Sequence, residues 1–140
     1  MDLFRLNAYI SIGGNKYSFV IVDDFSRFTW VFLLRDKGET QGILKKVSRR
    51  AQNKFEVKIK KVRSDNGIEF RNTNIEAFLD EEGIKHEFSV PYTPQQNGVV
   101  ERKNRTLIEA IIAMLDEYKI SEKDYWAKAI NTSCHVINHL

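Results

Sequence analysis

Two apolar runs near the start of the chain predict a buried β-hairpin. Residues 17–22 and 28–34 are rich in aromatic and β-branched side chains, and such runs favour buried strands. Asp23 to Arg27 make the short connection that an antiparallel pair needs. A further strand is predicted over residues 1–10, ahead of the turn residues Gly13-Gly14-Asn15.

The rest of the chain alternates between helical and strand-like patterns. We expect helices over residues 38–55, 73–82, 99–118 and 124–140, and strands over residues 57–62 and 84–90. In the helix at 73–82, Thr73 or Asn74 is the expected cap and Gly83 the expected end. In the helix at 99–118, apolar residues from Val100 to Met114 recur at the helical period, which predicts a strongly amphipathic helix.

This order of elements indicates an α/β fold. The three strands that come first suit an antiparallel meander, and the later strands alternate with helices, which suits parallel crossovers. The prediction is a mixed five-stranded sheet flanked by helices. With 140 residues and no internal repeat, low-complexity tract or linker, the chain fits one domain over residues 1–140.

Composition narrows the class of protein. A content of 42% hydrophobic residues is ordinary for a domain with a buried core. No apolar run reaches the roughly 18–20 residues that span a membrane, and a single cysteine, Cys134, excludes an internal disulfide and suits a reducing compartment. The net charge is +3, and basic residues gather at 45–54, 58–63 and 102–105. These clusters suit a polyanionic partner and, equally, a lysine-rich solvated surface.

Two acidic residues are candidates for chemistry. Asp65 follows the predicted strand at 57–62, and ligands of open α/β sheets bind beyond the carboxyl ends of the strands. The same Asp-Asn-Gly sequence is also good turn chemistry. Glu101 lies roughly 100° from the centre of the apolar stripe of its helix, at the edge of the buried face. An ordinary i,i+4 pair with Arg105 is its alternative.

The segment between these two acids favours a functional interpretation of both. Residues 90–98 combine prolines, glutamines and a glycine in a polar, conformationally specialised loop that leads into the helix of Glu101. Groups able to bind phosphate follow on that helix, namely Arg102, Lys103, Asn104 and Arg105. A plain connecting loop is the alternative, but it explains fewer of these features.

Paired carboxylates suit two-metal phosphoryl transfer, because hard oxygen ligands hold two cations roughly 3.5–4 Å apart. Two acids are rarely enough, so a third is expected from the early strands. The sequence offers Asp2, Asp23 and Asp24, and composition does not choose among them.

The sequence also resembles a known family. It is similar to the catalytic core of retroviral-type integrases, above all those of copia-type retrotransposons, over nearly all of its length. The matching stretches are YSFVIVDDFSRFTW (17–30), VRSDNGIEF (62–70), IKHE (84–87) and PYTPQQNGVVERKNR (91–105), with looser matches at Tyr125-Trp126-Ala127 and Ile137-Asn138. The segment PYTPQQNG-x-x-ER is highly specific. The thirty-five residues between Asp65 and Glu101 also agree with integrases of this type.

The resemblance implies a ribonuclease-H-like fold with an Asp, Asp, Glu triad that binds two Mg²⁺ or Mn²⁺ ions. Position by position, Asp65 matches the second aspartate, Glu101 the glutamate, and Asp2 the first aspartate, whose surroundings depart from the family at Arg5-Leu6. Asp23 and Asp24 match acids with a structural role.

The implied activity is joining of a retrotransposon DNA end to target DNA by transesterification. Contacts to DNA are implied for Gln95, Gln96, Asn97, Arg102, Lys103 and Arg105, with Gly98 as a hinge. Family proteins work as multimers in the nucleus, after a stage in a cytoplasmic particle. They also carry a zinc-binding N-terminal domain and a separate C-terminal region, neither of which is expected in residues 1–140. Two alternatives are a nuclease of the same fold and a catalytically inactive nucleic-acid-binding or assembly fragment.

Other candidates receive a structural interpretation. His135 and His139 have the i,i+4 spacing of a metal pair, but no further ligands accompany them, so we expect a packed or exposed helix face. Cys134 is expected to be a small buried side chain. Trp30 and Trp126 are assigned to the core.

Overall fold

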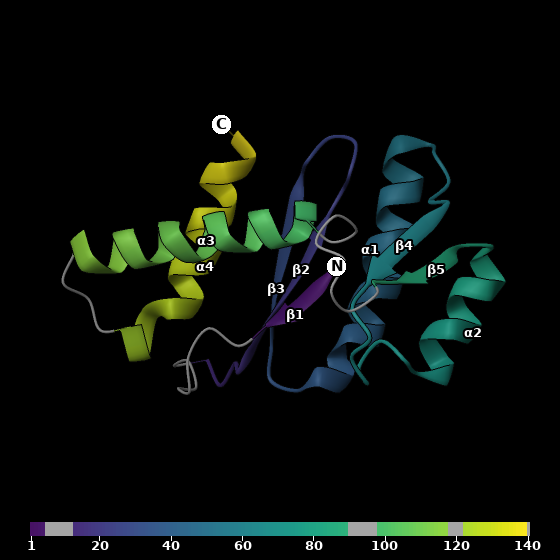
Figure 1. Cartoon of the computed structure of the whole chain (residues 1–140), viewed down its shortest axis with the longest axis horizontal. Helices are drawn as coiled ribbons and strands as arrows, with labels where there is room; N and C mark the ends of the chain where they lie inside the picture. Colours follow the sequence, from purple (N-terminus) through teal and green to yellow (C-terminus); the bar gives the residue numbers. More distant parts are fainter. Residues whose placement is uncertain (5–12, 90–97, 118–121, 140) are drawn as a thin grey trace. The chain divides into compact units, whose positions relative to one another are not determined.

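The computed structural model describes residues 1–4, 13–89, 98–117 and 122–139 (Figure 1). The chain divides into two compact units. One comprises Met1 and Lys37–Asn97, and the other comprises Asp2–Asp36 and Gly98–Leu140. The second unit is therefore built from two segments that are far apart in the sequence.

An antiparallel sheet forms the framework of the unit that begins at Asp2. Its strands are β1 (Asp2–Phe4), β2 (Tyr17–Val22) and β3 (Thr29–Leu34), with β2 in the centre. Val20 lies opposite Asp2 on one side and opposite Val31 on the other. The predicted hairpin and the predicted antiparallel meander are both confirmed.

The turn between β2 and β3 is organised by Asp23. Its carboxylate accepts hydrogen bonds from the hydroxyl and the backbone N–H of Ser26 and, at 3.4 Å, from the N–H of Phe25. Arg27 closes the turn in the left-handed region, with φ of 62°. The hydrogen bond from the Ser26 hydroxyl is the main cause that lowers the pKa of Asp23 below its ordinary value. The structural role expected of Asp23 is confirmed.

Replacement of this aspartate is expected to change how stability depends on pH. A carboxyl whose pKa is lowered by folding stabilises the folded state above the unfolded pKa, and this contribution is lost as pH falls. For Asp23→Asn, the deficit in free energy of unfolding should be full near neutral pH and shrink as pH falls through and below 3.8, the ordinary value. Urea unfolding at several pH values measures this. The exposed Asp24→Asn is the control and should show no such trend.

Two helices cover this sheet. They are α3 (Gly98–Glu117), which packs against β2, and α4 (Glu122–His139), which packs against β3; they also cross each other (Figure 1). Along α4, Trp126, Ile130 and Cys134 recur every four residues and are all buried. Cys134 joins Val20 of β2 and Leu107 of α3 in one core cluster. The core position expected of Trp126 is confirmed, whereas Trp30 of β3 is only half-buried.

A side chain near the end of α4 fastens that helix to the start of β3. The Asn138 Oδ1 accepts from the backbone N–H of Thr29 at 2.8 Å, and its Nδ2 donates to the Thr29 carbonyl at 2.7 Å. The Cys134 thiol donates to the same carbonyl at 3.3 Å. One amide thus pairs with both backbone polar groups of Thr29, at the edge of the core.

Loss of this amide should destabilise the unit. Asn138→Ala leaves the N–H of the buried Thr29 without its partner and its carbonyl with the weak Cys134 thiol donor alone, which costs roughly 1–3 kcal/mol in free energy of unfolding. Denaturant titration measures the change. Asn131→Ala is the matched control, because Asn131 is exposed on the same helix and should cost less than about 0.5 kcal/mol. Equal losses in both variants would show that the amide does not fasten α4.

A parallel strand pair and two helices make up the other unit. Its elements are a 3₁₀ turn η1 (Lys37–Glu39), α1 (Thr40–Phe55), β4 (Lys61–Ser64), α2 (Thr73–Glu82) and β5 (Lys85–Phe88). The register pairs Val62 with His86 and Ser64 with Phe88. Because side chains alternate along a strand, these four share one face.

The opposite face of β4 and β5 is charged. Glu87 there is surrounded by three cations. Its carboxylate lies 2.9 Å from the Lys61 ammonium, 3.4 Å from the Arg63 guanidinium and 3.4 Å from the Lys85 ammonium. The hydrogen bond from Lys61 is the main cause that lowers the pKa of Glu87. This face is therefore polar and half-exposed, and the unit buries its apolar residues on the other side.

The ends of α2 follow local sequence signals. Gly83 adopts φ of 67° and its N–H donates to the carbonyls of Leu79 and Asp80, which confirms it as the end of the helix. The expected cap was wrong by one or two residues. Asn72, not Thr73 or Asn74, is the N-cap, and its side chain accepts from the Asn74 N–H at 2.9 Å. Asn and Thr both suit a cap, so residue type alone did not separate the three positions.

The α/β class with mixed strand directions is confirmed, but a single five-stranded sheet is wrong for the described residues. They form a three-stranded antiparallel sheet and a two-stranded parallel sheet. Among the described residues, β1 pairs with β2 and β4 pairs with β5, so no strand pairing joins the two sheets.

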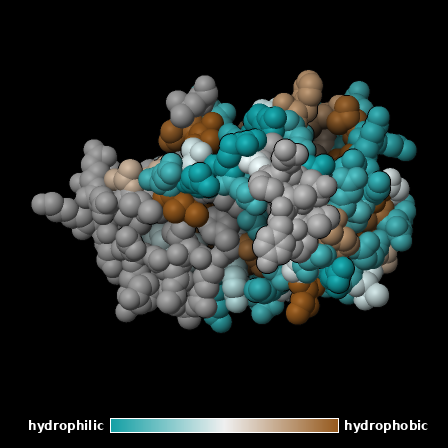
Figure 2. Space-filling view, viewed as in Figure 1, coloured by the Kyte–Doolittle hydropathy of each residue, from teal (hydrophilic) through white to brown (hydrophobic). Residues whose placement is uncertain are grey.

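The surface of the unit that holds α1 and α2 is mostly hydrophilic on the face shown in Figure 2, where hydrophobic residues form separate spots. Its exposed large hydrophobic residues, among those described, are Phe55, Val57 and Ile68. Within the described ranges no helix has the length and apolar character to cross a membrane.

Candidate functional site

Asp65 follows a strand, as predicted, although that strand covers residues 61–64 and not the predicted 57–62. It follows the last residue of β4, Ser64, at the carboxyl end of a parallel strand. Its Oδ1 accepts from the backbone N–H of Gly67 at 3.0 Å, so the turn interpretation of Asp-Asn-Gly also holds. Its Oδ2 has no hydrogen-bond partner among the described residues. One carboxylate oxygen thus fixes the turn, and the other is left for a ligand.

Gly67 provides the space in which this turn closes. A Cβ placed on Gly67 would lie 2.8 Å from the Glu69 carboxyl carbon and 3.0 Å from Asp65 Oδ1. Glu69 is nearly buried, with its side chain 11% exposed, and pairs with the Lys37 ammonium at 3.5 Å. Two carboxylates therefore converge beside Gly67, and any side chain there would push against both.

A buried chain of polar side chains lies immediately before Asp65. The Ser64 hydroxyl is 2.9 Å from His86 Nε2, and His86 Nδ1 is 2.6 Å from the Glu76 Oε1 on α2. The Ser64 hydroxyl is also 3.0 Å from the backbone carbonyl of Asp65, to which it donates. Ser64 is completely buried, and the His86 side chain is 3% exposed.

The other two acids of the predicted triad belong to the other unit. Asp2 is the first residue of β1 and is partly buried. Glu101 lies in the first turn of α3 and is exposed, more so than its expected place at the edge of the buried face. Glu101 and Arg105, both described, form no ion pair, so the alternative of an ordinary helix pair is not what the structure contains.

The basic residues that follow Glu101 differ in their surroundings. Arg102 and Arg105 are exposed, as contact with a phosphate backbone requires. Lys103 is half-buried, and its charge lowers the pKa of the Cys134 thiol, against the larger raising effect of burial. A Cβ at Gly98 would meet Arg102 Nη1 at 3.3 Å, so this glycine leaves room for the Arg102 side chain. Gln95, Gln96 and Asn97 lie outside the described residues.

Carboxylate oxygens of these residues have the chemistry that Mg²⁺ and Mn²⁺ prefer. Within neither unit does the described part of the chain gather three His, Cys, Asp or Glu side chains around one point. Asp65 is in one unit, and Asp2 and Glu101 are in the other. The partner-free Oδ2 of Asp65 fits a metal ligand, and the triad as a whole stays a prediction.

The remaining sequence candidates have structural surroundings. His135 and His139 are exposed with their rings 4.2 Å apart, and the His139 Nδ1 lies 2.7 Å from the carbonyl of His135. The expected exposed helix face is confirmed. Cys134 is buried, and burial is the main cause that raises the pKa of its thiol. The thiol is therefore an unreactive part of the core.

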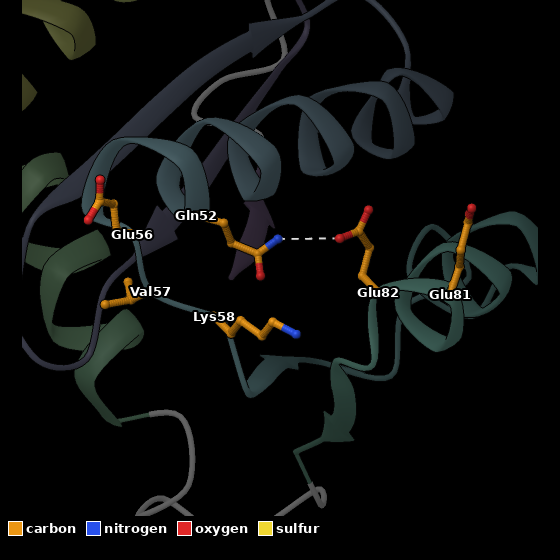
Figure 3. A pocket seen from close by; sticks show the side chains of 6 residues that line it. All are labelled: Gln52, Glu56, Val57, Lys58, Glu81 and Glu82. Atoms are coloured by element: carbon orange, nitrogen blue, oxygen red, sulfur yellow. Dashed lines mark hydrogen bonds between the residues drawn. The ribbon is translucent and has the colours of Figure 1, made fainter.

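A pocket of about 350 Å³ lies at the carboxyl ends of α1 and α2 (Figure 3). It is lined by Gln52, Glu56, Val57, Lys58, Glu81 and Glu82. The Gln52 amide spans it, with Nε2 donating to the Glu82 carboxylate at 3.4 Å (Figure 3) and Oε1 accepting from the N–H of Ile59 at 3.1 Å. This pocket contains none of the predicted site residues, and its three glutamates do not suit a polyanion.

The sequence did not single out Ser64, His86 or Glu76 as functional residues. Ser64 and His86 stand inside the motifs RSDNG and IKHE, and Glu76 is one of several acids in a surface-like helix. The signal that unites them is the parallel register of β4 and β5, which no single motif contains.

Comparison with known proteins identifies the family of the chain. The family described as integrase core domain matches residues 1–94. The chain is 41% identical over 128 residues to the retrovirus-related Pol polyprotein from transposon TNT 1-94 of Nicotiana tabacum, covering 91% of this chain and 10% of that protein. It is 33% identical over 131 residues to the corresponding polyprotein from transposon RE2 of Arabidopsis thaliana, covering 94% and 9%.

A more distant relative is the Ty1-DR4 Gag-Pol polyprotein of Saccharomyces cerevisiae, 27% identical over 141 residues, with 99% of this chain and 9% of that protein covered. The chain thus spans about a tenth of the length of the curated relatives it matches. It belongs to the integrase core domain family. The predicted resemblance to integrase catalytic cores of copia-type retrotransposons is confirmed.

The close approach of two carboxylates to Gly67 generates a prediction. Gly67→Ala places a methyl group within 3.0 Å of both, so the nearly buried Glu69 must move and its pair with Lys37 weakens. The expected loss is roughly 1–3 kcal/mol in free energy of unfolding, measured by urea titration. Adding Glu69→Ala should recover most of it, because the shortest contacts go to Glu69.

A glycine in a helix provides the control for this substitution. A Cβ on Gly42 of α1 would meet nothing within 4 Å. Gly42→Ala should therefore stabilise the protein by roughly 0.5–1 kcal/mol. A similar gain from Gly67→Ala would contradict the crowding described at Gly67.

Proposed function

We propose that the chain is the catalytic core of a metal-dependent DNA strand transferase that joins retrotransposon DNA ends to target DNA. The observation that carries this is the placement of Asp65. Its carboxylate follows a parallel strand, with one oxygen fixed by the Gly67 N–H and the other without a partner among the described residues. Membership of the integrase core domain family supports the reaction class.

Asp2, Asp65 and Glu101 are the proposed ligands of two Mg²⁺ or Mn²⁺ ions. Such ions, when bound, lower the pKa of an attacking hydroxyl and stabilise charge on the phosphate oxygens. Asp65 contributes Oδ2 to this task, and the hydrogen bond at Oδ1 restricts the rotation of its carboxylate. In the proposed reaction, the 3′-hydroxyl of a DNA end attacks a phosphodiester of the target, and the 3′ oxygen of the cleaved strand leaves.

DNA is the proposed partner. Exposed Arg102 and Arg105 are the described residues best suited to hold its phosphates, because they project from the first turns of α3 next to Glu101. Lys103 and the loop residues Gln95, Gln96 and Asn97 are proposed as further contacts. We also propose that the protein acts as a homo-oligomer on two DNA ends in the nucleus, after a stage in a cytoplasmic particle.

A branched DNA that mimics the joined product tests the proposal. With Mn²⁺ present, the chain is expected to reverse the joining. The target 3′-hydroxyl attacks the junction phosphodiester, which reseals the target strand and releases the element end with a 3′-hydroxyl, and gel electrophoresis of labelled DNA detects both products. Asp2→Asn, Asp65→Asn and Glu101→Gln should each reduce the rate by at least about a hundredfold, because each removes a metal ligand worth several kcal/mol. Asp24→Asn, a matched change of an exposed acid, should keep the wild-type rate.

The products separate the alternatives. Hydrolysis without strand joining would identify a nuclease of the same fold. DNA binding with no Mn²⁺-dependent cleavage or joining would identify an inactive binding module and overturn the proposal. A second readout is the melting temperature, which Mn²⁺ should raise in the wild type but not in Asp65→Asn, because a ligand stabilises only the state that binds it.

A further inference from the structure

The hydrogen-bonded series Glu76–His86–Ser64 joins three elements behind Asp65. Glu76 lies on α2, His86 on β5, and Ser64 is the last residue of β4. The His86 ring is covered by the Phe88 ring, with centroids 4.1 Å apart, whereas the Glu76 side chain is 42% exposed. A nearly buried imidazole is thus held at one nitrogen by a solvated carboxylate and at the other by a buried hydroxyl.

The same residue types form the triad of serine hydrolases, but the geometry excludes a nucleophilic Ser64. A nucleophile must reach its substrate, and Ser64 is completely buried. Its hydroxyl also has two acceptors within reach, His86 Nε2 at 2.9 Å and the Asp65 carbonyl at 3.0 Å. The series must therefore act through the backbone next to Ser64.

Two arrangements of the protons are compatible with these contacts. With Glu76 accepting from His86 Nδ1, the Nε2 of a neutral imidazole is an acceptor and receives a hydrogen bond from the Ser64 hydroxyl. In the doubly protonated imidazole, Nε2 donates to Ser64, and the hydroxyl proton turns to the Asp65 carbonyl. In both forms the Ser64 side chain is anchored to His86, and in the doubly protonated form its single proton also makes the hydrogen bond to the Asp65 carbonyl.

We propose that His86, oriented by Glu76, is a positioning residue that fixes the backbone at Asp65 through Ser64. This inference rests on the proposed function, because the direction of the Asp65 carboxylate matters only if that carboxylate binds metal. Outer partners of metal ligands act in this way, and their loss typically weakens metal affinity or activity by roughly 10–100-fold. The Gly67 N–H adds a hydrogen bond to Asp65 Oδ1, so the carboxylate of Asp65 is restrained as well as its backbone.

The first test needs neither metal nor activity. NMR order parameters of the Asp65, Asn66 and Gly67 amides report how rigidly this peptide is held. We expect values of about 0.85 in the wild type that fall toward about 0.6 in Ser64→Ala and Glu76→Ala. Glu76→Ala changes a half-exposed side chain, so it should fold even if the buried Ser64 does not tolerate replacement.

Two matched variants control for a merely structural effect. Glu82→Ala removes a carboxylate of the same helix that pairs with Arg49 and Gln52 of α1, away from the Ser64–His86 contact. It should leave the order parameters at Asp65 unchanged. Glu76→Gln keeps a side-chain oxygen for His86 Nδ1 and should restore the wild-type values.

The second test measures the Mn²⁺ concentration that gives half-maximal resolution of the branched DNA. It should rise about tenfold or more in Ser64→Ala and Glu76→Ala, and stay unchanged in Glu82→Ala and Glu76→Gln. The proposal is overturned if the Asp65 amides stay rigid in both disruptive variants, or loosen equally in Glu82→Ala. It is also overturned if they loosen in an active enzyme whose Mn²⁺ requirement does not change.

Failure of the proposed function gives a different result. An inactive wild type would remove the strand transferase assignment, while the order parameters would still decide whether the series fixes Asp65.

Discussion

The register of β4 against β5 is the constraint on which the candidate site depends. With Ser64 opposite Phe88 and Val62 opposite His86, one face of the pair carries Val62, Ser64, His86 and Phe88. A slip of one residue would exchange the two faces and move the charged side chains of Lys61, Arg63 and Glu87 inward. The same register ends the ladder at Ser64, so that Asp65 is the first residue free to turn. The ion pairs of Lys61 and Arg63 with Glu87 form only when these side chains face the solvent, and so they stabilise the observed register.

Each unit achieves its order by local anchoring of backbone groups. In one, Asn72 and Gly83 delimit α2, which places Glu76 beside His86. In the other, the Asn138 amide ties the end of α4 to the first residue of β3, and the buried residues of α4 cover the sheet below. The role proposed for Asp65 therefore depends on contacts made by residues that do not themselves meet a substrate. Elements that hold a reactive group rigid lower the cost of ordering it on binding.

Much of this architecture could be predicted from single segments of the sequence. The hairpin at 17–34, the helix at 73–82 and its end at Gly83 are encoded locally, by apolar runs and a residue that tolerates positive φ. Asp65 at a strand end was predictable for the same reason. The pairing of His86 with Ser64, twenty-two residues apart in the chain, required the register. The exposure of Glu101 and the division into two sheets depend on packing between distant segments, which periodicity does not report.

The division of the chain has a consequence for its synthesis. The sheet of β1, β2 and β3 is complete when residue 34 has been made, but α3 and α4, which cover it, begin only at residues 98 and 122. At about 5–20 residues per second, the apolar face of Val20 and Val31 waits several seconds for Leu107 and Cys134. Residues 37–97, in contrast, are contiguous and pair within themselves. The nascent chain therefore passes through a stage in which its first strands have no cover, and this is the stage at which a chaperone or aggregation would act on it.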